Sequence, residues 1–258
     1  MSIGPAIQVP GEMNSHKSLA LGVKRPDRRF FPWLAMFFAL LVFAGFSPSF
    51  YLHALFHRPL PPSTLIEFHG ALMTGWILLF LVQTFLVETG RLSWHRQFGI
   101  AGFAYAALIV PIGCVATLYA AGREIRAHSA FVPSQLNVLG LELTQMLLFA
   151  GLVLAGVLLR NRGDFHKRMM AMASLCILPN AVVRLILLSN INVLGSNLVI
   201  LTMWALLVLC IIGIDAYRLG RLHPAFAWSA SLAIASLYLA WLGSTTAAWN
   251  RYWIQVLR

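Results

Sequence analysis

The chain has 258 residues, of which 59% are hydrophobic and only 10% are charged, and its formal net charge is +11. Soluble domains carry about a quarter charged residues, so this composition excludes an ordinary soluble protein and indicates an integral membrane protein. The hydrophobic stretches are long enough to span a bilayer and do not alternate with polar residues, which favours helices over a β-barrel. The net charge is explained by membrane topology and anionic lipid, so no nucleic-acid partner is expected.

The sequence predicts an all-α bundle of seven membrane-spanning helices, forming one domain over residues 30–258. A polar, basic tail over residues 1–29 precedes it. The first hydrophobic stretch is too long for the apolar part of a signal peptide and has no small-residue cleavage site, so we expect it to remain as an anchor. The expected spans are 31–52, 65–87, 98–120, 135–159, 168–189, 194–217 and 225–247.

Lys and Arg in the short loops predict the orientation, because cytoplasmic loops carry the excess of positive charge. With a cytoplasmic N-terminus and an extracytoplasmic C-terminus, thirteen basic residues lie on the cytoplasmic side and five on the other. The thirteen are Lys17, Lys24, Arg25, Arg28, Arg29, Arg91, Arg96, Arg160, Arg162, Lys167, Arg168, Arg218 and Arg221, and the five are Arg58, Arg123, Arg126, Arg251 and Arg258. We therefore expect a multi-pass protein of the bacterial inner membrane, with anionic lipid headgroups as partners.

The second span contains HGALMTGWILLFLVQ, which begins at His69 and ends at Gln83 on the same helical face. A polar stripe of this kind is expected to face the bundle interior, because lipid cannot satisfy its hydrogen bonds. Interhelical hydrogen bonding that only stabilises the bundle is the alternative interpretation. By depth, His69 is expected to meet Glu142, Asn180 and Arg184 in the outer third of the membrane, with Glu142 and Arg184 paired.

Further histidines are expected on the same outer side. His53 and His57 lie one helical turn apart, His128 follows the third span, and His69 begins the second. Two histidines at this spacing with a further His or Glu are typical of zinc or copper sites. On this interpretation the pattern predicts an outer metal site. The alternative interpretation is that these histidines, which stand next to Phe and Pro, lie at the membrane interface and bind no metal.

At the other membrane face, SWHRQFG opens the third span and DFHKRMM opens the fifth. In each, a helix N-cap candidate stands two residues before a histidine, and a proline follows within the span (Pro111 and Pro179). This likeness suggests a duplicated hairpin. It predicts that His95 and His166 begin two parallel helices at the same depth.

The helix face below His95 is nearly free of side chains, since it carries Gly99 and Gly102. Such a strip either allows close helix packing or leaves room for a flat macrocycle ligated by the two histidines. In the second case Arg96 and Arg168 would bind the propionates. In the first, these His and Arg side chains would hold lipid phosphates at helix N-termini.

The stretches GRLSWHRQFGIAGF and DFHKRMMAMASLCILPNAVVRL resemble an uncharacterised family of bacterial multi-span membrane proteins of unknown function. Members carry HR-x-x-G after one span, then H-x-x-M leading to an Arg in the next hairpin, and the resemblance covers residues 65–190. The chain is also similar to four-helix transmembrane cytochromes b, in which histidines on alternate helices bind haem. That similarity implies that His95 and His166 form one ligand pair, whereas His69 would face Glu142 and leave a second pair incomplete.

The expected function is an inner-membrane redox or respiratory-chain-associated role, with haem b or quinone bound between the second and fifth spans. Subunits of respiratory or other membrane complexes are the expected protein partners. One alternative is a membrane-embedded zinc or copper enzyme that uses the outer histidines. Another is a non-catalytic subunit or assembly factor whose polar residues are structural.

Overall fold

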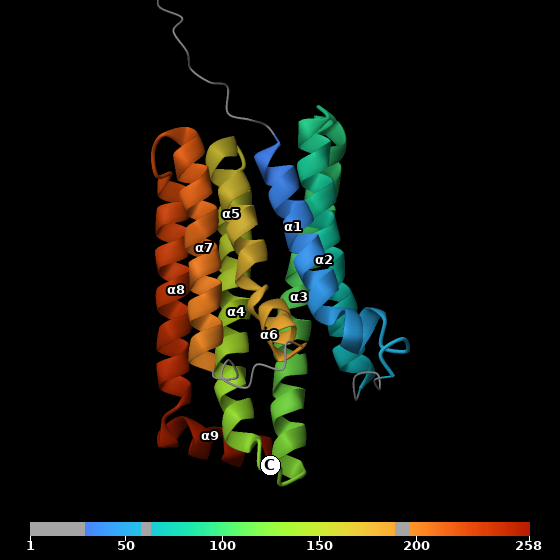
Figure 1. Cartoon of the computed structure of the whole chain (residues 1–258), viewed down its shortest axis with the longest axis vertical. Coiled ribbons are helices and arrows are strands. Elements are labelled where there is room, and N and C mark those ends of the chain that lie inside the picture. Colours follow the sequence, from blue (N-terminus) through green and yellow to red (C-terminus); the bar gives the residue numbers. More distant parts are fainter. Residues whose placement is uncertain (1–28, 58–62, 189–196) are drawn as a thin grey trace, which may run out of the picture.

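The computed structural model describes residues 29–57, 63–188 and 197–258, and of residues 187 and 188 it describes the backbone alone. Over these ranges the chain is helical and contains no strand, which confirms the all-α prediction (Figure 1). The helices are α1 (Phe30–Phe46), the π-helical η1 (Ser47–Tyr51), α2 (Thr64–Glu88), α3 (Leu92–Arg126), α4 (Val132–Leu158), α5 (Gly163–Cys176), α6 (Pro179–Leu188), α7 (Asn197–Leu219), α8 (Pro224–Ser244) and α9 (Ala247–Leu257).

Six of the described helices are long and apolar enough to cross a membrane, and the bent pair α5–α6 makes a seventh candidate. The chain is therefore a multi-span membrane protein. The expected seven spans are matched only if that pair counts as one crossing. The predicted tail lies outside the described residues except for residue 29, as do residues 194–196 of the sixth expected span.

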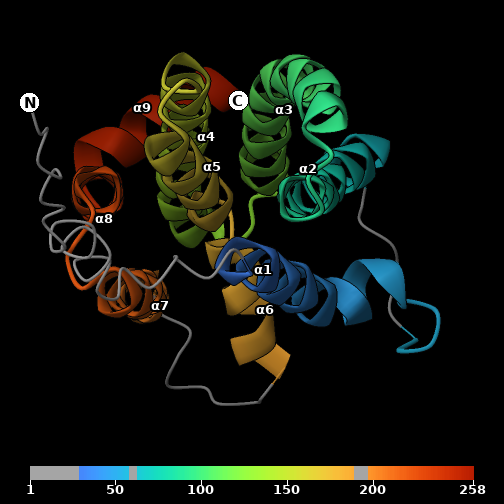
Figure 2. The ribbon, with the colours of Figure 1, turned by 90° about the horizontal axis from the view of Figure 1, so that it is seen from above.

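The helices run back and forth along one long axis. The α2–α3, α4–α5 and α7–α8 turns lie at one end of the bundle, and the α3–α4 turn and α9 lie at the other (Figure 1). Seen along this axis, α4 and α5 lie between the α7–α8 pair on one side and the α2–α3 pair on the other, and α1 and α6 lie together on a third side (Figure 2). Helix α4 contacts α3, α5 and α8, whereas α1 contacts α2 and α6.

Large apolar side chains fill the centre of the bundle. The indole of Trp76 on α2 meets the ring of Phe149 on α4 edge-on, with their centroids 4.8 Å apart. Its Nε1 donates a hydrogen bond to Oγ of Ser174 on α5 at 3.1 Å. An indole N–H buried in an apolar interior needs such an acceptor, so this contact fixes α2 against α4 and α5.

The fifth expected span, 168–189, is two helices with a bend of 41° between them. Pro179 causes the break, because it has no N–H to donate to the carbonyl of Leu175, four residues before it. The backbone N–H of Leu178 donates to that carbonyl instead, at 3.2 Å, and the indole Nε1 of Trp204 on α7 donates to it as well, at 2.9 Å. Trp204 is fully buried. A side chain from another helix thus adds a second hydrogen bond to a backbone carbonyl at the helix break.

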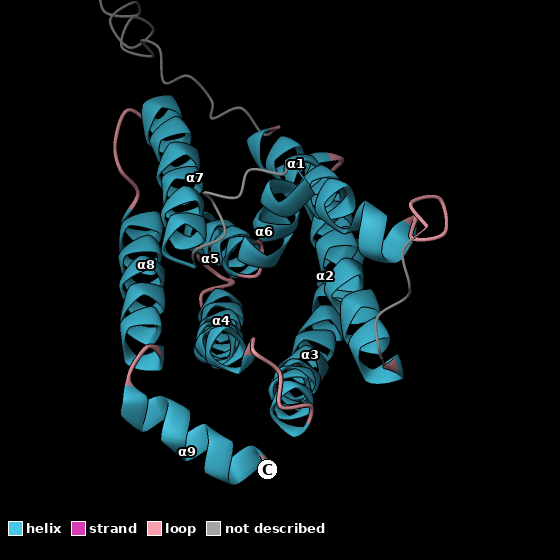
Figure 3. Cartoon of the chain, turned by 60° about the horizontal axis from the view of Figure 1, so that its bottom comes forward, coloured by secondary structure: helices cyan, strands magenta, loops and turns pink. Residues whose placement is uncertain are grey.

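Helix α9 was not expected from the sequence. It lies across the bundle end and contacts α3, α4 and α8 (Figure 3). Thr246 caps its start by accepting a hydrogen bond from the backbone N–H of Trp249 at 3.3 Å, and Nε1 of Trp249 donates to the carbonyl of Leu136 at 2.9 Å. This part of the chain is too short and too polar to cross a membrane, and its tryptophans suit the interface.

Candidate functional site

The structure brings the imidazoles of His95 and His166 together. The two side chains come from the first turns of α3 and α5, which begin at the same end of the bundle (Figure 1). Their ring centroids are 6.1 Å apart and the ring planes are nearly perpendicular, at 86°. Helices α3 and α5 themselves make few direct contacts, so the two rings approach each other across the bundle.

The protonation of His166 follows from its hydrogen bond. Its Nδ1 lies 2.8 Å from the carbonyl oxygen of Gly156 near the C-terminal end of α4. A carbonyl can only accept, so Nδ1 carries the proton, and in the neutral imidazole Nε2 is left with a free lone pair. The bond satisfies one of the last carbonyls of α4, which gives His166 a structural role. It also leaves Nε2 available to a ligand.

His95 has an available nitrogen as well. Its ring lies beside the backbone carbonyl of Gln83 on α2. Its Nδ1 is buried and has no hydrogen-bond partner in the described part of the chain, and the same holds for Oε1 of Gln83. Buried polar atoms are normally paired. Two unpaired atoms beside this histidine pair mark the region as a candidate ligand site.

The glycine strip below His95 is occupied by α2. A Cβ added to Gly102 would come within 2.9 Å of Cδ2 of Leu79, and one added to Gly99 would meet the Gln83 amide at 3.6 Å. These glycines allow close packing of α3 against α2. At these two positions the strip is covered by side chains of α2, so a macrocycle would not lie directly on the two glycines. Gln83 accordingly lies with the inner histidines and not with His69.

Arg168 corrects another expectation. Its guanidinium donates from Nε and Nη2 to the two carboxylate oxygens of Asp215 on α7, at 2.8 and 2.9 Å. A further bond runs from its Nη1 to the carbonyl of Asp164 at 2.9 Å. Both charged side chains are almost fully buried, at 2% and 5% exposure. Arg168 is therefore engaged inside the protein and is not available to a propionate, whereas Arg96 is exposed.

His223 lies in the α7–α8 turn next to this ion pair, and its contacts give it a structural role. Its Nδ1 accepts a hydrogen bond from the backbone N–H of Ala225 at 3.1 Å and so caps α8. Its ring packs edge-on against Phe165, with centroids 5.0 Å apart. Burial is the main cause that lowers the pKa of His223 below its ordinary value, and the nearby positive charge of Arg168 adds to it.

A second polar cluster lies toward the other end of the bundle. The carboxylate of Glu142 on α4 accepts a hydrogen bond from the hydroxyl of Thr117 at 2.8 Å, and a longer one from the amide of Asn180 at 3.4 Å. Asn180 belongs to the first turn of α6, so the helix break places its side chain here. Two of the expected residues thus meet, together with Thr117, which the sequence analysis missed.

His69 lies beside Gly113 on α3 and Met146 on α4. A Cβ added to Gly113 would have the Sδ of Met146 at 2.5 Å and Cε1 of His69 at 3.3 Å. Nδ1 of His69 is buried without a hydrogen-bond partner among the described residues. His69 therefore faces the interior, as the sequence predicted.

Arg184 does not pair with Glu142. Its Nη1 donates to Oγ of Ser49 at 2.8 Å, and its guanidinium lies 4.6 Å from the ring centroid of Phe46. No salt bridge joins it to Glu142 in the described part of the chain. The bend before α6 explains the difference, because it turns this helix toward α1 and η1, which supply Phe46 and Ser49 respectively.

The expected outer metal site is not formed. Within residues 29–57, 63–188 and 197–258, no three His, Cys, Asp or Glu residues are placed to hold a metal ion. His53 lies beside the start of α2, near Glu67, and His128 lies in the α3–α4 turn, beside α9. His57 has a left-handed backbone, with φ of 49°. The four histidines that the pattern grouped are thus spread over three places: His53 and His57 in the segment after η1, His128 in the α3–α4 turn, and His69 in the interior.

Comparisons with models of protein families, with curated proteins and with solved structures find no match to this chain. Its fold and sites define a class in broad terms: a multi-span helical membrane protein with two polar centres in a mostly apolar bundle.

Proposed function

We propose that the protein is a redox protein of the bacterial inner membrane, with a respiratory-chain-associated role, and that it binds haem b through His95 and His166. The single observation that carries this proposal is the pair of neighbouring imidazoles, 6.1 Å apart between ring centroids. In His95, Nδ1 makes no hydrogen bond within the described part of the chain. In His166, Nδ1 donates to a carbonyl, so Nε2 of the neutral ring carries the lone pair.

The donor set and its spacing suit a haem iron. A metal–imidazole bond is about 2 Å long, so His95 and His166, whose ring centroids are 6.1 Å apart, would be able to hold one iron between them. Ligating histidines typically donate their other N–H to a carbonyl, which fixes the tautomer and the ring orientation. The bond from Nδ1 of His166 to Gly156 has this form.

The two arginines that were expected to bind the propionates, Arg96 and Arg168, have different roles around this pair. Bound haem b would supply reversible one-electron transfer. Arg96 is exposed beside His95 and is available to pair with a propionate. Arg168 holds the first turns of α5 against α7 through Asp215 and so positions His166, two residues before it.

The test is an absorption spectrum of the purified protein after expression with ample haem. A Soret band and a reduced-minus-oxidised difference spectrum are expected for the unchanged protein. His95→Ala and His166→Ala should each remove most of that signal. His128→Ala is the matched control, because His128 is exposed at the opposite end of the bundle, and it should leave the spectrum unchanged.

A further arm separates ligation from folding, because His166 also satisfies a carbonyl of α4. Added imidazole should restore a low-spin spectrum to His95→Ala, since a free imidazole can occupy the space of the missing ring. An unchanged protein without a Soret band, or two His→Ala variants with unchanged spectra, would overturn the proposal.

A quinone at the second cluster is the other candidate, and one observation favours it. The Nδ1 of His69 is buried without a partner among the described residues. His69 lies beside Gly113 and Met146, one helical turn from Thr117 and Glu142 respectively. A quinone reaches its site from the lipid phase and accepts hydrogen bonds at its carbonyl oxygens, which an imidazole N–H can supply. Quinone retained through purification should be lost in His69→Leu and kept in the control His53→Leu. Equal retention in both would exclude His69 as the ligand-binding group.

A further inference from the structure

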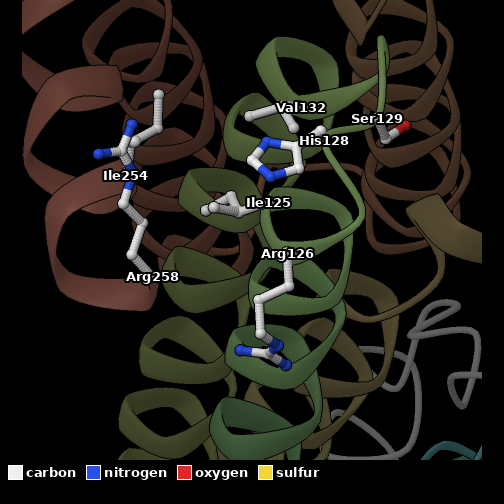
Figure 4. A pocket seen from close by; sticks show the side chains of 7 residues that line it. All are labelled: Ile125, Arg126, His128, Ser129, Val132, Ile254 and Arg258. Atoms are coloured by element: carbon white, nitrogen blue, oxygen red, sulfur yellow. The ribbon is translucent and has the colours of Figure 1, made fainter.

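A pocket opens at the end of the bundle that lies opposite the histidine pair. Its walls are the last turn of α3, the α3–α4 turn and the end of α9, and it encloses about 440 Å³. Figure 4 shows the side chains of Ile254 and Arg258 on the α9 side, and those of Ile125, Arg126 and His128 on the α3 side.

The walls are held together by specific contacts. Nε1 of Trp249 fixes α9 to α4 through the carbonyl of Leu136, at 2.9 Å. Nη1 of Arg126 donates to the carbonyl of Leu257 at 3.4 Å, which ties the end of α3 to the end of α9. A small apolar core beneath α9 includes Ile125, with the side chain of Ile254 packed against it. The pocket is therefore built into the fold and does not require α9 to move.

The lining combines positive charge with apolar surface. Arg126 and Arg258 supply the charge, Ile125 and Ile254 supply apolar walls, and no carboxylate side chain lines the pocket. The nearest acidic residue in sequence, Glu124, is engaged by Arg123 at 2.8 Å. An anionic ligand would meet two guanidinium groups and no acidic side chain at the lining.

The position in the molecule indicates what kind of anion would reach the pocket. Helix α9 lies across the ends of α3, α4 and α8 and carries Trp249, Tyr252 and Trp253, the residue types that occupy the headgroup layer of a membrane. The pocket is thus at the depth of lipid phosphates.

The distribution of basic residues gives independent support. Only five Lys or Arg residues are expected on this side of the membrane, and four of them are in the last turn of α3 or in and after α9: Arg123, Arg126, Arg251 and Arg258. On a face where topology disfavours positive charge, most of it is thus carried by the two elements that form the pocket, and Arg126 and Arg258 line it.

We propose that this pocket binds the phosphate group of an anionic phospholipid, with Arg126 and Arg258 as the charged contacts. The acyl chains lie against Ile125 and Ile254. The bound lipid fastens α9 to the end of α3 from the membrane side. This site is independent of any cofactor at His95 and His166.

The test is lipid binding by the full chain, purified in a neutral detergent, measured by native mass spectrometry. The probes are phosphatidylglycerol, phosphatidylcholine and inorganic phosphate. The unchanged protein should bind one phosphatidylglycerol more tightly than phosphatidylcholine. Arg126→Gln/Arg258→Gln should weaken that tightest site about tenfold, roughly the loss of one charge-assisted hydrogen bond. Arg251→Gln, exposed on α9 but outside the pocket, is the matched control and should bind like the unchanged protein.

Arg258→Gln alone separates binding from the docking of α9, because it keeps the bond between Arg126 and Leu257. It should also weaken phosphatidylglycerol binding while leaving the near-ultraviolet circular dichroism of the tryptophans unchanged. Equal affinity for the two lipids, or unchanged binding in the double variant, would overturn the proposal. Inorganic phosphate that displaces the lipid at equal concentration would make this a free-anion site and would refute the lipid assignment.

Discussion

The buried ion pair of Arg168 and Asp215 predicts an unusual pattern of stabilities. We consider Arg168→Met, Asp215→Leu and the double variant. In the protein, Nε and Nη2 of Arg168 donate to both carboxylate oxygens, at 2.8 and 2.9 Å, and both side chains are almost inaccessible. Removing one partner leaves the other charge buried and unpaired.

The magnitude follows from that burial. Each single substitution should lower the free energy of unfolding by about 3–5 kcal/mol, the cost of stranding a buried charge. Replacing both charged groups by apolar side chains removes the stranded charge together with its partner. The double variant should therefore lose clearly less than the sum of the two single losses. It should still lose some stability, because the bond from Arg168 to the carbonyl of Asp164 also disappears.

Equilibrium unfolding in mixed micelles, followed by circular dichroism, measures these differences. Lys167→Met is the matched control. Lys167 is next to Arg168 and forms an ion pair with Asp164, but the side chains of Lys167 and Asp164 are exposed to 36% and 69%. Its removal should change the free energy of unfolding by less than about 1 kcal/mol. Strictly additive losses, or single losses as small as that of the control, would refute the reasoning.

Other measurements test separate features. The pKa of His223 is lowered in the folded state, so its contribution to stability should be fully present above the ordinary pKa of 6.5 and should be lost as the pH falls below that value. The variant His223→Asn can still cap α8 and should show a weaker dependence of the melting temperature on pH. Gly45→Ala should destabilise by about 1–3 kcal/mol, since its Cβ would lie 2.5 Å from a backbone carbonyl of α6, while Gly151→Ala, with nothing within 4 Å, should be neutral or slightly stabilising in a melting assay. A topology reporter fused after Arg258 should be active only outside the cytoplasm and one at Gly163 only inside; activity of both on one side would contradict the predicted orientation.

Composition and periodicity were sufficient to predict a helical bundle, because a segment that crosses lipid must satisfy its own backbone hydrogen bonds. They also anticipated that His95 and His166 begin their helices at the same depth, since depth depends only on the position of the span ends. The proximity of Glu142 and Asn180 followed from the same depth count.

What the sequence could not determine is how each helix is rotated and bent. The pairing of Arg184 with Ser49 depends on the bend before α6, which a depth count cannot detect. Asp215 was overlooked, although an acid near the end of an apolar span is itself a signal that a partner exists. The partner of Asp215 is Arg168, because α5 and α7 come together at this end of the bundle. From its place in the sequence, Arg168 had been expected to bind a propionate.

The hydrogen bond from Trp204 to the carbonyl of Leu175 has a consequence for how the protein is made. Pro179 leaves that carbonyl without its usual helical donor. The N–H of Leu178 supplies one bond, and the second comes from α7, which is synthesised later. A chain that has inserted only through α6 therefore lacks one of the two hydrogen bonds at the break until α7 arrives beside it. The C-terminal part of the chain thus completes the packing of a bend that was formed before it.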